Sequence, residues 1–161
     1  MKIRRAVRGD AKDICRIYNH YVLNTTVSFE TDEVSTEEMQ DRIETITKFY
    51  PWLVCESGRD LIGYAYAAQW KERKAYSRSA ECAVYVDKDH HGKGAGALLY
   101  GRLIEECRSA GLHLLIAGIT LPNEASIAFH EKFGFSYIGK FSEVGLKFGN
   151  IIDVGYWTLV I

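Results

Sequence analysis

The feature that most constrains this chain is a glycine-rich segment between an apolar stretch and the start of an amphipathic pattern. The apolar stretch ends with Val84, Tyr85 and Val86, and His91-Gly92-Lys93-Gly94-Ala95-Gly96 follows it. Glycine permits positive φ angles and lets a ligand approach the backbone amides closely. A helix that begins near Gly94 adds unpaired N–H groups and a partial positive charge. A strand, a glycine loop and a helix in this order favour a phosphate-binding site.

The spacing of the glycines narrows the choice of ligand. The segment does not match G-x-x-x-x-G-K-[ST], so a nucleotide P-loop is disfavoured. It does not match G-x-G-x-x-G either, because the third glycine comes two residues after the second. The dinucleotide fingerprint also follows the first strand of its unit, whereas here three predicted strands and two predicted helices come before the strand that leads into the loop. The alternative interpretation is a tight connection between strand and helix that binds nothing.

Composition limits the partners that this chain can bind. Of the 161 residues, 47% are apolar and 25% charged, which is typical of one globular domain over residues 1–161. Lys and Arg total 20 against 21 Asp and Glu, a net charge of −1. No overall basic field is therefore available for nucleic acid or for an anionic membrane surface, and an anionic ligand has to be bound locally.

Targeting signals and metal-binding patterns are also missing from the sequence. No apolar run approaches the roughly 20 residues that cross a bilayer, and the first residues lack the apolar core of a signal peptide. The four cysteines are scattered, which predicts free thiols in a reducing cytoplasm. His90 and His91 form the only close histidine pair, so we expect no metal site.

Hydrophobic periodicity predicts a single α/β domain of the α+β type. Strands are expected at residues 2–6, 52–56, 61–69, 79–86, 113–120, 135–143 and 151–160. A first helix is expected after a cap at Asp10, and a second after a Ser35–Glu38 capping box. A third runs from near Gly94 to Gly111, and a fourth starts at Asn123 and ends before Gly134. The predicted element order is β-α-α-β-β-β-α-β-α-β-β.

The glycine loop and the element order together resemble the GCN5-related N-acetyltransferases, the GNAT superfamily. Residues 91–96 are similar to the family's pyrophosphate loop, Q/R-x-x-G-x-G/A, although His91 stands where Gln or Arg is usual. Residues 123–135 resemble the helix that in this family lies beside the pantetheine arm of the cofactor. The resemblance implies acetyl-CoA as donor, and a twisted, mixed, mostly antiparallel sheet of about seven strands flanked by four helices.

Further blocks resemble the phosphinothricin acetyltransferase subfamily. They lie at residues 18–21, 50–54, 70–76, 81–86, 148–150 and 153–157. The subfamily acetylates the α-amino group of phosphinothricin and, in many members, of methionine sulfoximine or methionine sulfone. The resemblance implies a small-molecule acceptor and a homodimer whose two-fold interface lies near the C-terminal strands and residues 148–150. Acetylation of a protein N-terminus or a polyamine, and a non-catalytic acyl-CoA sensor, remain alternatives.

Acetyl transfer to an amine needs a base, an oxyanion donor and a proton for the leaving thiolate. Glu81 is the candidate base, acting directly or through water in a ternary complex, because burial in an apolar strand raises a carboxyl pKa. Its structural alternative is a salt bridge with Arg78. The family resemblance places the oxyanion donor on the backbone of the same strand and implies a β-bulge there. His130 and Tyr85 are the candidates for protonating the thiolate.

The remaining site predictions concern contacts with the two substrates. The expected acetyl-CoA contacts are Val84, Tyr85, Val86, His91, Gly92, Lys93, Gly94, Ala95, Gly96, Asn123, Ser126 and His130. An acceptor carboxylate and a second polar head call for cationic and hydroxyl donors. The expected acceptor contacts are Phe29, Lys71, Arg73, Tyr76 and Arg78. Arg78 departs from the aromatic residue of the phosphinothricin-specific enzymes, so the resemblance leaves the acceptor itself open.

Overall fold

A seven-stranded sheet in the order β1-β2-β3-β4-β5-β7-β6 organises the chain in the computed structural model, which describes residues 1–161. The strands are β1 (Lys2–Arg5), β2 (Trp52–Ser57), β3 (Asp60–Gln69), β4 (Ser79–Val86), β5 (Leu114–Leu121), β6 (Ser136–Lys147) and β7 (Asn150–Val160). The helices are α1 (Ala11–Asn24), α2 (Thr36–Ile46), α3 (Ala95–Ser109) and α4 (Glu124–Lys132). Only β4 and β5 pair in parallel. The predicted fold class and element order are confirmed.

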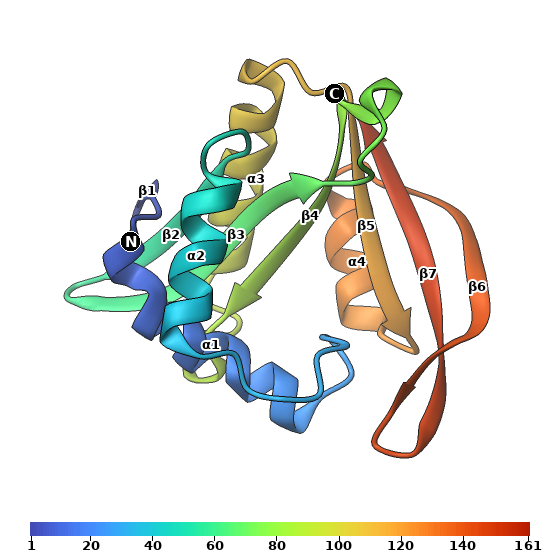
Figure 1. Ribbon diagram of the computed structural model, residues 1–161, viewed down its shortest axis with the longest axis horizontal. Coiled ribbons are helices and arrows are strands. Elements are labelled where there is room, and N and C mark those ends of the chain that lie inside the picture. Colours follow the sequence, from blue (N-terminus) through green and yellow to red (C-terminus); the bar gives the residue numbers. More distant parts are fainter.

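Helices cover both faces of this sheet, α1 and α2 on one face and α3 and α4 on the other (Figure 1). Strand β2 packs against the helices on both faces of the sheet, because its successive side chains point to opposite faces. Leu53 and Cys55 belong to the apolar cluster under α3, whereas Trp52 and Val54 belong to the cluster under α1 and α2. The sheet is therefore buried on both faces. None of the helices combines the length and the apolarity that a membrane crossing requires.

The caps predicted for the first two helices differ in outcome, since the one at Ser35 is confirmed and the one at Asp10 is wrong. The Ser35 hydroxyl accepts the N–H of Glu38 at 3.1 Å and caps α2. Asp10 precedes α1, but its side chain makes no capping hydrogen bond. Its carboxylate instead accepts both Arg4 guanidinium nitrogens at 2.7 Å and the Val7 N–H at 2.8 Å. A bidentate guanidinium is a stronger partner than a helix amide, so tertiary contacts override the local cap.

The space for a ligand comes from the divergence of β4 and β5. They pair over three positions only, from Ser79 with Leu114 to Glu81 with Ile116. Beyond that point β4 continues with β3 and β5 continues with β7, each in an unbroken antiparallel ladder. The ladder of β3 and β4 has no register shift, so the β-bulge expected on β4 is absent. The strands separate because each follows its other neighbour in the twisted sheet.

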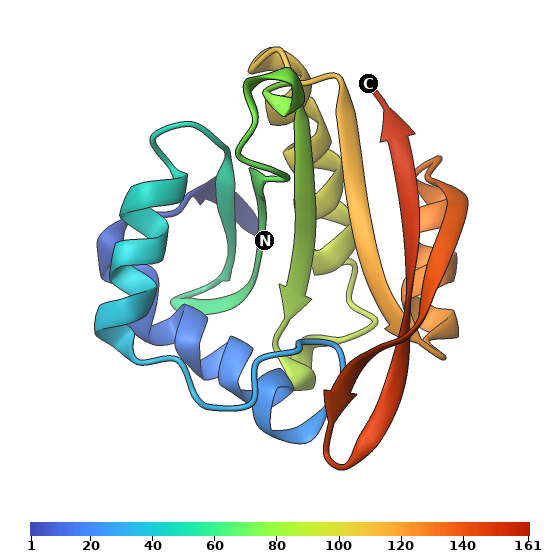
Figure 2. The same cartoon turned by 45° about the vertical axis from the view of Figure 1, so that its right-hand side comes forward.

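The β6–β7 hairpin is longer and more bent than predicted. Strand β6 extends to Lys147, and its pairing with β7 shifts register between Tyr137 and Gly139 and again between Phe141 and Gly145. Such bulges bend a strand and increase its twist. The two strands are joined by Phe148 and Gly149, both with positive φ, as in the tightest hairpin turns. The end of the hairpin lies beside the segment between α1 and α2 (Figure 2).

Candidate active site

A cavity of about 530 Å³ opens where β4 and β5 diverge, at the N-terminus of α3. Gly94 precedes the helix with a φ of +85°, and no side chain caps the first amides. A positive φ at this position requires glycine or a strained side chain. Of the residues predicted to contact acetyl-CoA, those lining this cavity are Val84, Tyr85, Val86, His91, Gly92, Gly94, Ala95, Gly96, Asn123, Ser126 and His130. Lys93 is the exception, since its ammonium donates to the Asp89 carbonyl at 2.9 Å.

Strand β4 presents unpaired backbone groups to this cavity. The N–H of Asp87 donates to the Ile62 carbonyl of the neighbouring chain segment at 2.8 Å. Because backbone groups of successive residues point to opposite sides of a strand, those of Val84 and Val86 face the gap toward β5. The Val86 carbonyl already accepts the Tyr21 hydroxyl at 2.5 Å. The backbone of Val84 is thus directed into this cavity.

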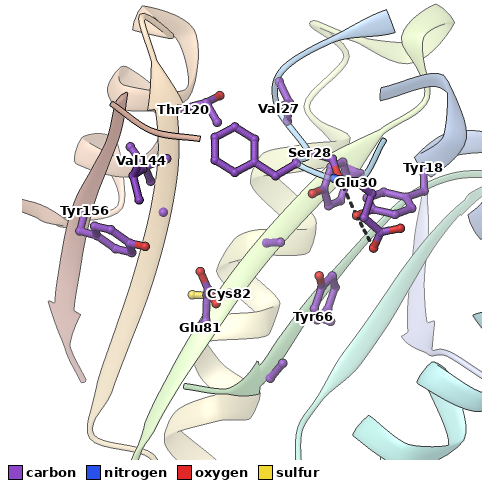
Figure 3. Close-up of a pocket in the computed structure, with 16 residues that line it drawn as sticks. Tyr18, Val27, Ser28, Glu30, Tyr66, Glu81, Cys82, Thr120, Val144 and Tyr156 are labelled. Carbon is purple, nitrogen blue, oxygen red and sulfur yellow. Dashed lines mark hydrogen bonds between the residues drawn. The ribbon is translucent and has the colours of Figure 1, made fainter. Parts of the chain in front are cut away.

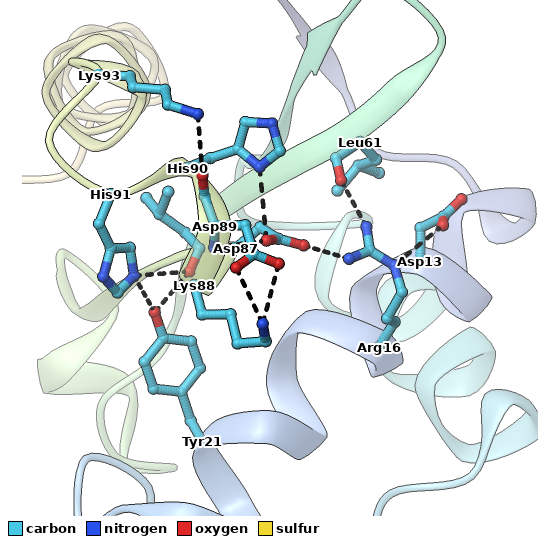
Figure 4. A network of polar contacts seen from close by, with 11 residues as sticks. Asp13, Arg16, Tyr21, Leu61, Asp87, Lys88, Asp89, His90, His91 and Lys93 are labelled. Atoms are coloured by element: carbon cyan, nitrogen blue, oxygen red, sulfur yellow. Dashed lines mark hydrogen bonds and ion pairs between the residues drawn. The ribbon is translucent and has the colours of Figure 1, made fainter.

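The loop before the glycines is held by a polar network from α1 (Figure 4). Burial by itself raises the pKa of Asp87, but hydrogen bonds from the Asp89 amide, Arg16 and His90 outweigh it and bring the pKa to about 2. Asp87 therefore stays ionised and ties the end of β4 to α1. Arg16 also donates to the Leu61 carbonyl at 2.8 Å. These contacts place the glycine loop before any ligand binds.

His91 is engaged through its ring as well as its backbone. Its Nε2 lies 2.7 Å from the Tyr21 hydroxyl and 3.1 Å from the Val86 carbonyl oxygen. Since the Tyr21 hydroxyl donates to Val86, the His91 Nε2–H is the donor to the Tyr21 oxygen in this arrangement. The Nδ1 side of the ring remains available to the cavity, which His91 lines. The departure from Gln or Arg at this position is thus accommodated by Tyr21.

A second cavity of about 460 Å³ lies on the α1 side of β4 (Figure 3). Its lining consists of Tyr18, Val27, Ser28, Phe29, Glu30, Tyr66, Ala68, Glu81, Cys82, Ala83, Tyr85, Gly118, Thr120, Val144, Val154 and Tyr156. The two cavities share five residues, namely Val27, Cys82, Ala83, Tyr85 and Gly118. A group held in the first cavity and a group held in the second can therefore meet across the middle of β4.

Glu81 faces the second cavity near the point where β4 and β5 separate (Figure 3). A Cβ placed on Gly118 would lie 3.3 Å from its Oε1 and 3.3 Å from the Tyr156 ring, so the glycine keeps this space open. Burial raises the pKa of Glu81. The alternative salt bridge with Arg78 does not form, because Arg78 Nε donates to the Gly111 carbonyl at 3.0 Å. Glu81 is an unpaired carboxylate with raised basicity.

Tyr85 lines both cavities, and the alternation of side chains along β4 places it on the same strand face as Glu81. Its ring lies edge-on to Tyr18 and Tyr21, with centroids 5.2 and 5.4 Å away, and stacks on Tyr64. Burial raises its pKa well above the ordinary value. The hydroxyl therefore keeps its proton near neutral pH and can act as a hydrogen-bond donor.

His130 lies on α4, and its side chain is 6% exposed at the wall of the first cavity. Its Nδ1 is 2.7 Å from the Ser126 carbonyl oxygen, which can only accept, so the hydrogen resides on Nδ1. Burial lowers the pKa of His130, which keeps the ring neutral. The Nε2 then has a lone pair and no proton to donate. This geometry suits His130 as an acceptor and leaves Tyr85 as the better donor.

The predicted acceptor contacts divide into two groups. Phe29 lines the second cavity, but Lys71, Arg73, Tyr76 and Arg78 line neither cavity. They lie on the loop after β3, at the end of the sheet where β4 and β5 are still paired. The Lys71 ammonium rests 5.9 Å from the centroid of Tyr76. The structure thus separates the basic loop from the cavity wall.

Several residues that line the cavity could not be predicted from the sequence, including Tyr66, Thr120 and Tyr156. They lie on three different strands, and nothing in their local sequence distinguishes them from core aromatics or ordinary strand residues. The one local signal is the alternation of Tyr64 and Tyr66 on β3, which predicts that both face the same side. Only the strand register places that side next to Glu81.

Comparison with known proteins identifies the family. The sequence model described as "Acetyltransferase (GNAT) domain" matches residues 3–155. The chain belongs to the GNAT acetyltransferase family. It is 38% identical to a phosphinothricin N-acetyltransferase of Streptomyces viridochromogenes, over 98% of this chain and 86% of that protein. It is 37% identical to an L-methionine sulfoximine/L-methionine sulfone acetyltransferase of Salmonella typhimurium, over 99% and 94%.

Solved structures agree with this GNAT assignment. A ribosomal-protein-alanine N-acetyltransferase from Brucella melitensis superposes with a TM-score of 0.98 at 34% identity, over all of both chains. YncA, a putative acetyltransferase from Salmonella typhimurium, was solved with its cofactor acetyl-CoA. It superposes with a TM-score of 0.96 at 37% identity, over 99% of this chain and 93% of that one. The chain is an N-acetyltransferase, and acetyl-CoA is bound in a relative of the same fold.

Proposed function

We propose that this protein transfers the acetyl group of acetyl-CoA to the α-amino group of a small amino-acid-like acceptor. The acceptor belongs to the class of phosphinothricin, methionine sulfoximine and methionine sulfone, and it attacks the thioester directly in a ternary complex. The observation that carries the proposal is the meeting of the two cavities across β4, beside the unpaired carboxylate of Glu81. The names and the identity of the two curated relatives support this acceptor class.

The chain offers groups that fit acetyl-CoA, which supplies the activated acetyl thioester. The uncapped first amides of α3 and the positive φ angles of Gly92 and Gly94 suit the pyrophosphate. The backbone of Val84 suits the amide groups of the pantetheine arm. His130 Nε2 offers an acceptor on the opposite wall of the cavity, on α4.

Each chemical requirement has a candidate group on this chain. Glu81 takes a proton from the acceptor ammonium, so the neutral nitrogen can form a bond to the thioester carbonyl carbon. A backbone N–H of β4 at Val84 donates to the oxyanion of the tetrahedral intermediate. When the C–S bond breaks, the electron pair leaves on sulfur. The Tyr85 hydroxyl gives its proton to the thiolate, and the excess proton of the attacking nitrogen replaces it on the Tyr85 oxygen as the neutral amide forms. Tyr85 lines both cavities, which supports this assignment.

The test is acetyl-CoA-dependent thiol release with a panel of amines. The panel holds phosphinothricin, methionine sulfoximine, methionine sulfone, spermidine and peptides with free N-termini. We expect turnover with the amino-acid-like compounds alone. Turnover confined to peptides or spermidine would refute the acceptor class. Acetyl-CoA binding without turnover on any amine would favour a sensor over an enzyme.

We further propose a homodimer formed through the β6–β7 hairpin. Its large apolar side chains are unusually exposed, namely Tyr137, Ile138, Phe141, Leu146, Phe148, Ile151 and Val160. Exposed apolar side chains gathered on one hairpin favour an interaction site, and β6 is also an unpaired edge of the sheet. Sedimentation velocity is expected to give a dimer, and a stable monomer at micromolar concentration would refute the proposal.

A further inference from the structure

Lys147 is a buried lysine with no carboxylate partner. Its residue is only 2% exposed, at the last position of β6. The ammonium donates to the Ser28 carbonyl at 2.6 Å and lies 5.0 Å from the centroid of the Phe148 ring. Lysine is almost never fully buried unless it is paired. The bond to Ser28 is therefore the contact that accommodates this charge, and it joins two segments 119 positions apart.

Ser28 belongs to one wall of the second cavity. Residues 27–30, here called the acceptor wall, all line that cavity. Two side chains of the wall are held from the helices: the Ser28 hydroxyl lies 2.8 Å from the Tyr18 hydroxyl, and Arg42 donates to the Glu30 carboxylate at 2.6 Å (Figure 3). The Lys147 ammonium, by contrast, donates a hydrogen bond to a main-chain carbonyl of the wall, that of Ser28. It is the polar contact that ties the wall to the β6–β7 hairpin.

A close packing contact accompanies the Lys147 bond. A Cβ placed on Gly145 would lie 2.3 Å from the Phe29 ring, so the ring of the acceptor wall rests directly on the β6 backbone. The register shift before Gly145 bends β6 toward this contact. The hairpin therefore meets the wall at two neighbouring positions, Gly145 by packing and Lys147 by a charged hydrogen bond.

We propose that Lys147 is a positioning residue for the acceptor. Its ammonium holds the acceptor wall against the hairpin, and acceptor affinity depends on this bond whereas acetyl-CoA binding does not. The proposal rests on the proposed function in one respect, the assignment of the second cavity to the acceptor. Lys147 lines neither cavity, so it acts through Ser28 and touches no reacting atom.

The kinetic test compares Lys147→Met with two other lysine variants. Lys147→Met keeps an unbranched side chain but removes the charged donor, and we expect KM for methionine sulfoximine to rise about tenfold or more. The dissociation constant of acetyl-CoA, measured by calorimetry, should stay within about twofold. Lys147→Arg, which retains a cationic donor, should recover most of the loss. Lys140→Met is the matched control, since Lys140 pairs with Asp153 at an exposed position of the same strand. An unchanged acceptor KM, or an equal loss of acetyl-CoA affinity, would overturn the proposal.

Two further measurements keep the proposal decisive. Gly145→Ala serves as the test if Lys147→Met does not fold. It forces a methyl group onto Phe29 and leaves the Lys147 ammonium in place, and it should raise the KM for methionine sulfoximine. Hydrogen exchange is independent of turnover. The amides of residues 27–30 should exchange faster in Lys147→Met and in Gly145→Ala, while residues 91–96 stay unchanged. If the wild type acetylates no amine, the proposed function fails and the exchange result alone decides whether Lys147 holds the wall. Exchange equal to wild type would refute it.

Discussion

Replacing Glu81 by glutamine tests the proposed mechanism most directly. Glu81→Gln keeps the shape of the side chain and removes its basicity. Because Glu81 has no ion-pair partner, the change leaves no cation unpaired. A general base contributes about 10²–10⁴-fold to a rate. We expect kcat/KM for methionine sulfoximine to fall about 100-fold or more near neutral pH, equivalent to about 2.7 kcal/mol at about 1.4 kcal/mol per tenfold.

The pH profile separates loss of a base from loss of structure. In the wild type the rate rises with pH as Glu81 loses its proton, and burial raises the pKa of Glu81, so this limb lies above the range of an exposed glutamate. In Glu81→Gln this limb should vanish, leaving only the dependence due to the acceptor amine. Thiol release is measured between pH 4.5 and 9, with a chromogenic disulfide or, at the acidic end, by chromatography. This range covers both the limb due to Glu81 and the dependence due to the acceptor amine.

The Glu81→Gln substitution should lower activity without lowering the stability of the folded chain. Because the pKa of Glu81 is raised in the folded chain, this group favours folding when protonated, and that contribution is lost as pH rises through the folded pKa. Glu81→Gln should therefore melt no lower than the wild type near neutral pH. Glu105→Gln is the matched control, since Glu105 is exposed and 3.3 Å from Arg102. Activity of Glu81→Gln within threefold of wild type, with its acid limb intact, would refute the assignment of the base.

Three further outcomes follow from the geometry. Asp87→Asn loses a carboxylate whose pKa is held at about 2. Because Arg16 is half exposed, we expect about 1–2 kcal/mol of lost stability near neutral pH, and urea unfolding should show the difference from wild type shrinking as pH falls from 4 toward 2. Gly94→Ala places a side chain at a φ of +85°, a strain of about 1–3 kcal/mol; calorimetry should show weaker acetyl-CoA binding, and unchanged affinity would contradict the role of the loop. Gly118→Ala puts a methyl group 3.3 Å from Glu81 Oε1, so turnover should fall more than acetyl-CoA affinity, and a normal kcat would show that this space is not used.

Much of the cofactor side could be predicted because its signals are local. The glycine loop, the start of α3 and the Asn123 cap of α4 depend on residues close together in the chain, and the cap bond from Asn123 to the Ser126 amide is present at 3.1 Å. Where the local prediction failed, the side chain had taken a competing hydrogen-bond partner. Asp10 turned to Arg4 on another element, and Lys93 turned to the carbonyl of Asp89.

The acceptor side could be predicted much less. Lys71, Arg73 and Arg78 precede Glu81 closely in the sequence, which suggested that they bind the acceptor carboxylate. The loop that bears them lies at the end of the sheet where β4 and β5 are still paired, outside the cavity. The residues that do line the cavity come from β3, β4, β5, β6 and β7, from α1 and from residues 27–30, with Tyr66 and Tyr156 on opposite sides of Glu81 (Figure 3). Strand register and sheet twist bring them together, and neither property is encoded in a short window of sequence.

By itself the sequence determined the order of helices and strands, the glycine-rich turn at residues 91–96 that leads into α3, and the placement of Glu81 and Tyr85 on one strand face. These follow from side-chain periodicity and glycine conformation, which act over a few residues. The tertiary structure alone decided that β4 and β5 separate without a bulge and that Lys147 reaches Ser28. Those outcomes depend on which distant groups compete for each hydrogen bond and each neighbouring strand, and that competition exists only in the folded chain.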